Sequence, residues 1–182
     1  MKTDFFKYQG TGNDFVIIDN RNGHNLALNP EMIKDLCDRR FGIGAAGLML
    51  LNEKEGYDFE MIYYNADGRE GTMCGNGGRC LVKFAESLGI QKELYKFIAT
   101  DGEHEAKIDT NGIVYLKMND VDTIINHHSD FLVDTGSPHY VKMIPHLAAY
   151  DVFKKGREIR YSREFEKEGI NVNFVEQLDE PD

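Results

Sequence analysis

The sequence predicts an α+β fold built mainly from antiparallel sheet, and two observations lead to this prediction. Short segments rich in β-branched or aromatic residues, bounded by Gly, Asn or Asp, outnumber the segments with helical periodicity. Phe59, Met61 and Tyr63 also occupy every second position of the segment 59–64. This period of two is typical of a sheet with one face buried more deeply than the other.

The expected strands are spread over the whole chain. They cover residues 15–19, 48–52, 59–65, 113–119, 131–135, 140–144 and 172–178.

The first expected helix follows Asn29, which can act as the N-cap, and Pro30 suits its first turn. Ile33 and Cys37 lie on one apolar stripe, and Gly42 lies just beyond the expected end.

The second expected helix follows Gly78 and ends at Gly89. Its apolar stripe includes Cys80 and Phe84. A third helical stretch is expected at 146–155.

Two pairs of similar short strings within the sequence suggest a duplicated unit. The string TGND at 11–14 has a counterpart in TGSP at 135–138, and FGIG at 41–44 has one in EGIN at 168–171. The two offsets are similar and the order is the same, as duplication predicts.

The strands and helices expected before Asn119 are enough for a complete α/β unit, whereas fewer are expected after Asn119. We therefore expect an N-terminal α/β unit at 1–119 that carries Cys74. Residues 120–182 are expected to begin a second, incomplete unit.

The composition indicates a globular chain and argues against two kinds of partner. The 182 residues are 41% hydrophobic and 29% charged, with a formal net charge of −10. No basic excess is present to displace counterions from phosphates. We therefore expect neither nucleic acid nor an anionic membrane as a partner, whereas a small-molecule substrate is compatible with this charge.

The beginning of the sequence does not resemble an export signal, because charges interrupt its apolar residues. No apolar run approaches the length needed to span a bilayer. The sequence has 3 cysteines, an odd number, which indicates reduced thiols. A cytoplasmic protein is expected.

The cysteines fall into two classes. Cys37 and Cys80 lie on apolar stripes, where cysteine behaves as a small hydrophobic residue. Cys74 precedes Gly75, Asn76 and two further glycines in the turn that opens the second helix. The unpaired amides and the helix dipole there favour a thiolate, and the same amides can hold a carboxylate or an oxyanion. Cys74 is thus a candidate nucleophile or general base in a carboxylate-binding pocket.

Other site types receive little support. The spacing of the cysteines and histidines matches no zinc site, so no metal is expected. The five residues between Cys74 and Cys80 exceed the spacing of a C-x-x-C redox pair. Residues 10–15 lack the full glycine fingerprint of a dinucleotide site and precede a strand.

Residues 64–80, YNADGREGTMCGNGGRC, closely resemble the first active-site motif of the diaminopimelate epimerase family. The usual family string is Asn-Ala-Asp-Gly, a short gap, and then Met-Cys-Gly-Asn-Gly-x-Arg-Cys. Proline racemases and the phenazine-pathway isomerases share the fold but resemble this sequence less around Cys74 and Asn65. Further ordered matches to the epimerase family lie at 10–20, 39–51, 135–141 and 169–174.

The resemblance implies two pseudo-symmetric halves, each a mainly antiparallel sheet around a central helix, with the active site in the cleft between them. It implies cofactor-independent inversion of one α-carbon of diaminopimelate, from the L,L to the meso isomer. Two thiols act as base and acid in this family, without pyridoxal phosphate or metal. The reaction serves lysine and peptidoglycan precursor synthesis in bacteria, and a homodimer is the family expectation.

The resemblance also implies roles for single residues. Cys74 would be one of the acid/base thiols, and His139 would lie near the thiols and tune their protonation. Gly75 and Asn76 would bind the carboxylate at the reacting end. The residues that would contact the polar ends of the substrate are Asn13, Asn65 and Asn171, with Ser137 where the family usually has Asn.

Simpler explanations of three of these residues stay open. Ordinary turn formation also accounts for Asn13 and Asn65, and an exposed strand start accounts for His139.

The sequence departs from the family pattern at further points. Ala46 stands where the family usually has Asp, and the second cysteine motif is not found before Asp182. We therefore expect the 182-residue chain alone to be inactive in the complete inversion. A related racemase or isomerase independent of pyridoxal phosphate, and a non-catalytic binding module with one half-site, are the alternatives.

Overall fold

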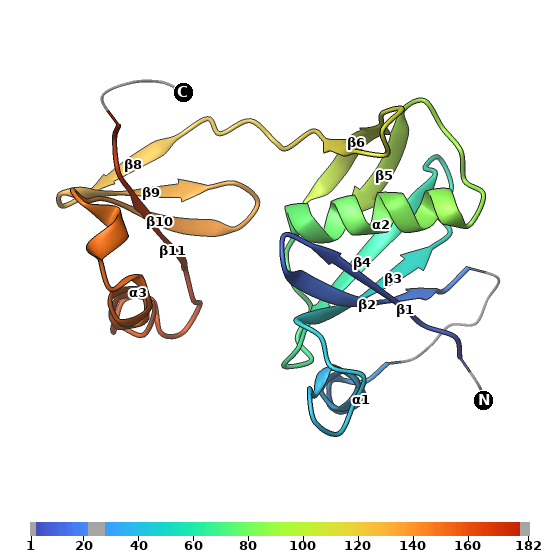
Figure 1. Ribbon diagram of the computed structural model, residues 1–182, viewed down its shortest axis with the longest axis horizontal. Helices are drawn as coiled ribbons and strands as arrows, with labels where there is room; N and C mark the ends of the chain where they lie inside the picture. Colours follow the sequence, from blue (N-terminus) through green and yellow to red (C-terminus); the bar gives the residue numbers. More distant parts are fainter. Residues whose placement is uncertain (1–2, 22–27, 179–182) are drawn as a thin grey trace. The chain divides into compact units, whose positions relative to one another are not determined.

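The computed structural model describes residues 3–21 and 28–178. The chain divides into two compact units, Met1–Met118 and Asn119–Asp182. Each unit combines a sheet with helix, which confirms the α+β class (Figure 1). Within the described residues, no helix has both the length and the apolar character needed to cross a membrane.

The sheet of the first unit contains, in the described residues, seven strands that lie side by side in chain order. They are β1 (Phe6–Gly10), β2 (Asn13–Asp19), β3 (Gly47–Asn52), β4 (Phe59–Asn65), β5 (Tyr95–Ala99), β6 (Gly102–Ile108) and β7 (Val114–Leu116). Neighbouring strands are antiparallel except in the pairs β2–β3 and β4–β5. Each parallel pair is connected through a helix, either α1 (Pro30–Cys37) or α2 (Gly75–Ser87), because parallel neighbours require a crossover.

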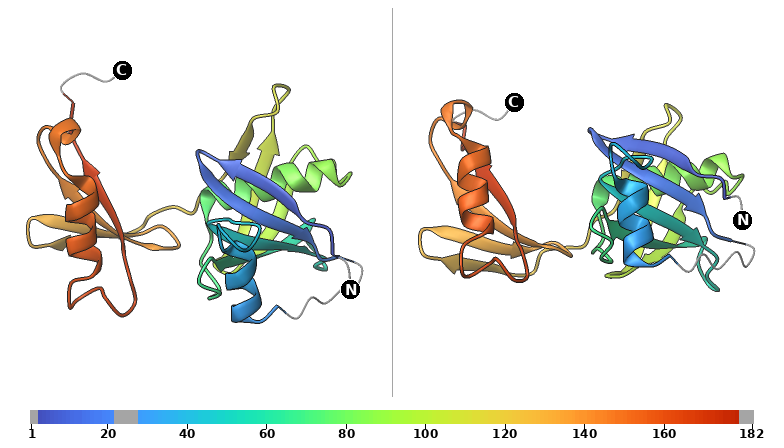
Figure 2. Two further views of the ribbon diagram at one scale, coloured as in Figure 1. Left: turned by 60° about the horizontal axis from the view of Figure 1, so that its bottom comes forward. Right: turned by 90° about the horizontal axis from the view of Figure 1, so that it is seen from below.

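Helix α2 is the centre of the first unit (Figures 1 and 2). It contacts both edge strands of the sheet, β1 and β7, and also β2, β3, β4 and β6. Since one helix reaches both edges, the sheet curls around it. A mainly antiparallel sheet around a central helix is thus confirmed for this unit.

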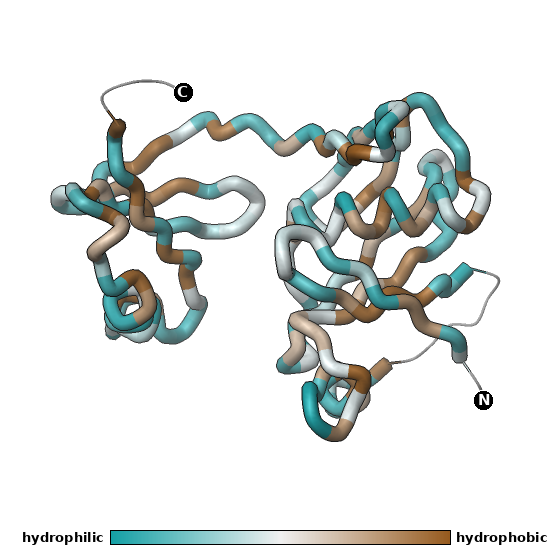
Figure 3. The backbone as a smooth tube through the Cα atoms, in the orientation of Figure 1, coloured by the Kyte–Doolittle hydropathy of each residue, from teal (hydrophilic) through white to brown (hydrophobic). Residues whose placement is uncertain are grey.

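Strands β2 and β3 are buried on both faces. Phe15 and Met49 belong to the apolar cluster that includes the buried face of α2. Val16 and Leu48 belong to a second cluster, which includes Ile33 of α1. Successive strand residues point to opposite faces, so a strand covered on both faces consists of continuous apolar residues. Figure 3 shows hydrophobic residues gathered along these central strands.

The first helix is shorter than predicted. It begins as expected, with the Asn29 side chain accepting the backbone N–H of Met32 at 2.8 Å. It ends at Cys37, well before Gly42, because Asp38 is extended at φ −61° and ψ 128°. The Asp38 carboxylate accepts two backbone N–H groups of the following turn, at 2.7 and 2.8 Å.

The other helix boundaries also differ. Helix α2 begins at Gly75 rather than after Gly78, so the glycines form its first turn. The stretch predicted at 146–155 is a short 3-10 turn, η1 (Leu147–Ala149), followed by helix α3 (Val152–Arg160).

Strands β1, β5, β6 and, in the second unit, β8 (Ile124–His127) were not predicted. Strand β6 shows the reason, because its buried residues His104 and Ala106 alternate with exposed or half-buried charged ones. Its apolar content is too low to mark a strand. The strand predicted at 113–119 is shorter, Val114–Leu116.

The described part of the second unit is a four-stranded sheet in the order β11-β10-β9-β8. Its other strands are β9 (Asp130–Asp134), β10 (Pro138–Met143) and β11 (Asn171–Val175). The pair β10–β11 is parallel, and α3 lies in its connection and contacts β11. The buried apolar residues described in this unit are Tyr140, Ile144 and Ile170, so its core is small.

Candidate active site

Cys74 is the N-cap residue of α2 and is half-buried. Its backbone carbonyl accepts the first helical hydrogen bond, from the N–H of Gly78 at 2.7 Å. The N–H groups of Gly75 and Asn76 precede that bond and have no partner within the helix. The thiol therefore lies beside backbone donors at the positive end of the helix dipole.

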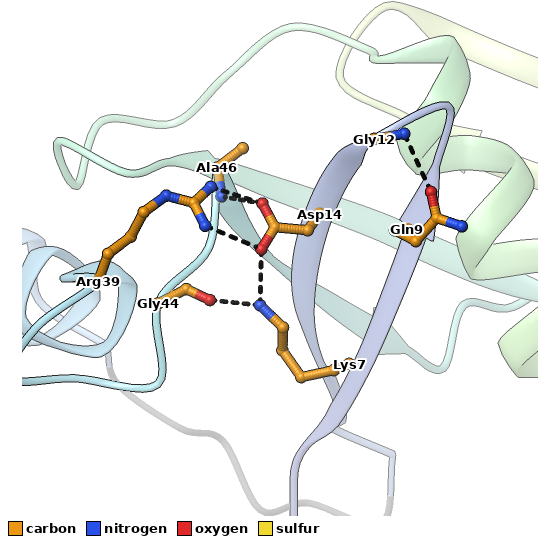
Figure 4. Close-up of polar contacts among 7 residues, drawn as sticks. All are labelled: Lys7, Gln9, Gly12, Asp14, Arg39, Gly44 and Ala46. Carbon is orange, nitrogen blue, oxygen red and sulfur yellow. Dashed lines mark hydrogen bonds and ion pairs between the residues drawn. The ribbon is translucent and has the colours of Figure 1, made fainter.

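The Asn13 side chain lies beside this thiol, with Nδ2 donating to Cys74 Sγ at 3.7 Å. Asn13 begins β2, directly after the turn from β1. Thr11 and Gly12 have positive φ angles of 53° and 83°, as a tight hairpin turn requires. Gln9 accepts the N–H of Gly12 at 3.0 Å, which closes the turn (Figure 4).

The same hairpin packs closely on the first turns of α2. A Cβ atom added at Gly10 would lie 3.4 Å from Asn76 Cβ and 3.5 Å from Cys80 Sγ. The structure thus brings Asn13, Cys74, Gly75 and Asn76 together, although they come from two separate segments.

An ion-pair cluster holds the neighbouring residue Asp14 (Figure 4). Its carboxylate accepts hydrogen bonds from Arg39 at 2.7 and 3.2 Å, from Lys7 at 2.9 Å and from the Ala46 N–H at 3.1 Å. Lys7 also donates to the Gly44 carbonyl. The hydrogen bond from Arg39 is the main cause that holds the pKa of Asp14 well below its usual range. Ala46 takes part through its backbone, although the family's usual Asp side chain is absent there.

Asn65 is exposed at the end of β4. Its Oδ1 accepts a hydrogen bond from the Tyr63 hydroxyl at 3.2 Å. The backbone of Asn65 closes the turn that follows. Its carbonyl accepts a hydrogen bond from the Gly68 N–H, and its N–H donates to the Arg69 carbonyl, both at 2.9 Å. Tyr63 was not among the predicted site residues, because nothing in its local sequence indicates that its ring reaches the amide.

The two other cysteines have different surroundings. Cys37 is 3% exposed and Cys80 is 5% exposed. Burial raises the pKa of the Cys37 thiol. It raises the pKa of Cys80 to about 11, with a smaller contribution from charge on Cys74. Of the three thiols, Cys74 is the one that combines access with backbone donors.

The remaining predicted site residues, Ser137, His139 and Asn171, belong to the second unit. His139 and Asn171 are partners in the β10–β11 register. Asn173 Nδ2 lies 2.9 Å from His139 Nδ1, and this amide also donates to two backbone carbonyls at 3.4 Å. Because the Asn173 amide group donates to Nδ1 of His139, that ring nitrogen is the acceptor. The neutral imidazole ring therefore carries its proton on Nε2.

Asn173 is not among the site residues predicted from the sequence. A signal was available, because Asn171 and Asn173 are two residues apart and thus share one face of a strand.

The comparison with a family model gives a match over residues 5–124, and this model describes diaminopimelate epimerase. The chain is 51% identical to the diaminopimelate epimerase of Flavobacterium psychrophilum over 94% of its length and 67% of the relative's. It is 43% identical to that of Chlorobaculum tepidum, over 92% of this chain and 67% of the relative.

Among solved structures, the chain resembles the phenazine biosynthesis protein of the PhzF family from Bacillus anthracis. The TM-score is 0.64 at 15% identity, and the match covers 99% of this chain and 69% of the other. This likeness concerns the fold. The matched family model and the identity to two epimerases over most of the chain show that the protein belongs to the diaminopimelate epimerase family.

Proposed function

We propose that this chain carries out proton transfer at the α-carbon of diaminopimelate, with Cys74 as one of the two acid/base groups of the epimerisation. The observation that carries the proposal is the half-buried Cys74 thiol at the start of α2, with the Asn13 amide at 3.7 Å. A general base has to reach the proton that it removes, and this thiol is accessible where the other two are buried.

The proposed step begins with the Cys74 thiolate. It takes the α-proton, so the C–H bond breaks, an S–H bond forms and the electron pair moves into the substrate carboxylate. The N–H groups of Gly75 and Asn76 stabilise the charge that develops there. A second group returns a proton on the opposite face, which inverts the carbon.

The other predicted residues complete this proposal. The residues that bind the polar ends of the substrate are Asn13, Asn65, Ser137 and Asn171. His139, with its proton on Nε2, tunes the proton-transfer groups. The substrate is a small molecule, and the protein is located in the cytoplasm. The assembly is a homodimer, and size-exclusion chromatography with light scattering tests this oligomeric state.

The experiment follows α-deuteration and isomer ratio of L,L-diaminopimelate in deuterated water. The 182-residue chain is expected to exchange the α-hydrogen, and Cys74→Ala is expected to slow this exchange by about 10²–10⁴-fold. Cys37→Ala is the matched control, because it removes a thiol from the other apolar cluster. Exchange that survives in Cys74→Ala contradicts the proposal.

The isomer ratio tests the second group. Cys37 and Cys80 are buried, so the cysteines of this sequence offer one accessible thiol, and net inversion by residues 1–182 should be slow compared with exchange. Rapid net inversion would instead point to His139 as the second group, and His139→Gln would then abolish it.

A further inference from the structure

The Tyr63 hydroxyl is bonded to one end of the Asn65 side chain. It donates to Oδ1 at 3.2 Å, and the amide nitrogen at the other end could not accept such a bond. No acceptor for Nδ2 of Asn65 is found among the described residues. In this arrangement the hydroxyl holds the oxygen end of the amide, and the Nδ2 donor is the end left available to a ligand.

The tyrosine ring itself has little freedom. A Cβ atom at Gly47 would lie 2.5 Å from Tyr63 Cε2, and one at Gly71 would lie 2.5 Å from Cδ1 and 3.0 Å from Asn65 Nδ2. The ring also packs edge-on against Phe15, with the ring centres 6.0 Å apart. Two glycines thus leave the space that the ring fills, and the position of its hydroxyl is well defined.

The hydroxyl remains a donor at any physiological pH. Burial raises the pKa of Tyr63 to about 12, and charge on Cys74 adds to the increase. Tyr63 and Cys74 also pack against the same apolar cluster. The tyrosine is therefore connected both to Asn65 and to the surroundings of the thiol.

We propose that Tyr63 is a positioning residue that turns the Asn65 amide so that its N–H groups face the substrate. This inference rests on the proposed function, in which Asn65 binds a polar end of diaminopimelate. An amide nitrogen attracts a substrate carboxylate, whereas the amide oxygen repels it. Without the hydroxyl the amide can flip and present the wrong end.

The kinetic test compares Tyr63→Phe with the matched control Tyr64→Phe in the α-hydrogen exchange assay. Tyr64 is the next residue on β4 and packs with the other apolar cluster, so the same oxygen is removed on the opposite face. We expect Tyr63→Phe to raise KM about 10–150-fold, as for the loss of one hydrogen bond to a charged group. Its kcat should change by less than about threefold, and Tyr64→Phe should leave both constants within about twofold.

A double-mutant cycle separates positioning from a general structural effect. In an Asn65→Ala background, Tyr63→Phe should change KM by less than about twofold, because the residue through which it acts is gone. An unchanged KM in Tyr63→Phe alone, or an equal effect in both backgrounds, overturns the proposal.

A measurement without substrate distinguishes this inference from the proposed function. Side-chain amide signals in ¹⁵N NMR, assigned with Asn65→Asp, should shift in Tyr63→Phe and stay in place in Tyr64→Phe. If the wild-type chain exchanges no α-hydrogen, the proposed function fails while this signal still reports on the amide. A signal that is insensitive to Tyr63→Phe rejects the positioning role.

Discussion

At the scale of single residues, burial separates the cysteines into the two classes that their sequence positions predict. Cys74 and Cys80 lie on the same helix, yet the pKa of Cys80 is raised to about 11, chiefly by burial. Cys74 lies at the helix start, where its thiol is half-buried and Asn13 reaches it. Cys80, six positions after Cys74, is thus buried in the core, whereas a reagent can reach the thiol of Cys74.

Cys74 should therefore react first with a small alkylating reagent at about pH 8, because thiolate access controls the rate. Cys37 and Cys80 have raised pKa values and remain thiols at this pH. Mass spectrometry of the native, partly labelled chain measures the order. Equal or faster labelling of either buried cysteine contradicts the argument, and labelling in denaturant serves as the control.

Asp14 makes a pH-dependent contribution to stability. Its pKa is lowered by hydrogen bonds from Arg39 and Lys7. The contribution is therefore fully present above the unfolded value near 3.8 and is lost as the pH falls through the lowered pKa. Asp14→Asn should reduce the free energy of unfolding at neutral pH by about 1.5–3 kcal/mol, the range for hydrogen bonds to charged groups.

Urea unfolding of wild type and Asp14→Asn over a pH series measures this, and the difference should shrink toward about pH 2. The control is Asp67→Asn, because Asp67 and Arg69 form a pair with side chains 48% and 80% exposed. Such a surface pair contributes about 0–1 kcal/mol. A pH-independent effect of Asp14→Asn would refute the explanation.

At the scale of elements, two turns carry site residues of the first unit. The β1–β2 hairpin presents Asn13 to α2, and the turn after β4 follows Asn65. The second turn also packs on the start of α1, where Gly68 lies against the backbone of Pro30. The conformation at Asn65 therefore depends on a contact with a distant helix.

Gly68→Ala should destabilise the chain strongly for this reason. Gly68 has φ +88°, and an added Cβ would lie 2.2 Å from the Pro30 carbonyl oxygen. Gly89→Ala is the matched control, because Gly89 has φ +86° and open space around it. The control should lose about 1–2 kcal/mol from backbone strain alone, and Gly68→Ala should lose at least about 2 kcal/mol more. Similar thermal midpoints for the two variants would show that the contact with Pro30 yields easily.

At the scale of the whole molecule, the two units differ in the size of their cores. The first unit contains both apolar clusters, including fully buried aromatic residues such as Phe15, Phe59 and Phe84. The described core of the second unit is limited to a few buried apolar residues around Tyr140. The segment 117–123 that joins the units is exposed and has no regular structure.

Limited proteolysis should therefore cut first within 117–123, because exposed irregular segments are preferred sites. The N-terminal product should persist, and amide hydrogen exchange should be slower in β2 and β3 than in β10, in line with the larger core. Electrospray mass spectra of the products identify the cut. A stable product that ends well before residue 110 would argue against this division.

Some features could be predicted from the sequence because they depend on local interactions. The cap at Asn29, the apolar stripe of α2 and the position of Cys74 near the helix start follow from neighbouring residues. Boundaries were less predictable: α1 ends early because Asp38 bonds to the turn after it, and β6 is a strand despite its charged residues.

The sequence by itself determined the α+β class and the family, and it predicted the candidate site residues other than Tyr63 and Asn173, since periodicity, capping and motif spacing are properties of nearby positions. Only the tertiary structure decided which side chains meet: Asn13 with Cys74, Tyr63 with Asn65 and Asn173 with His139. The first and third pairs join residues far apart in the chain. The second depends on a ring held between Gly47 and Gly71. The physical reason is that a hydrogen bond requires an approach of about 3 Å, and tertiary packing sets that distance. The hairpin packs against α2 in the first pair, two glycines leave space for the ring in the second, and β10 pairs with β11 in the third.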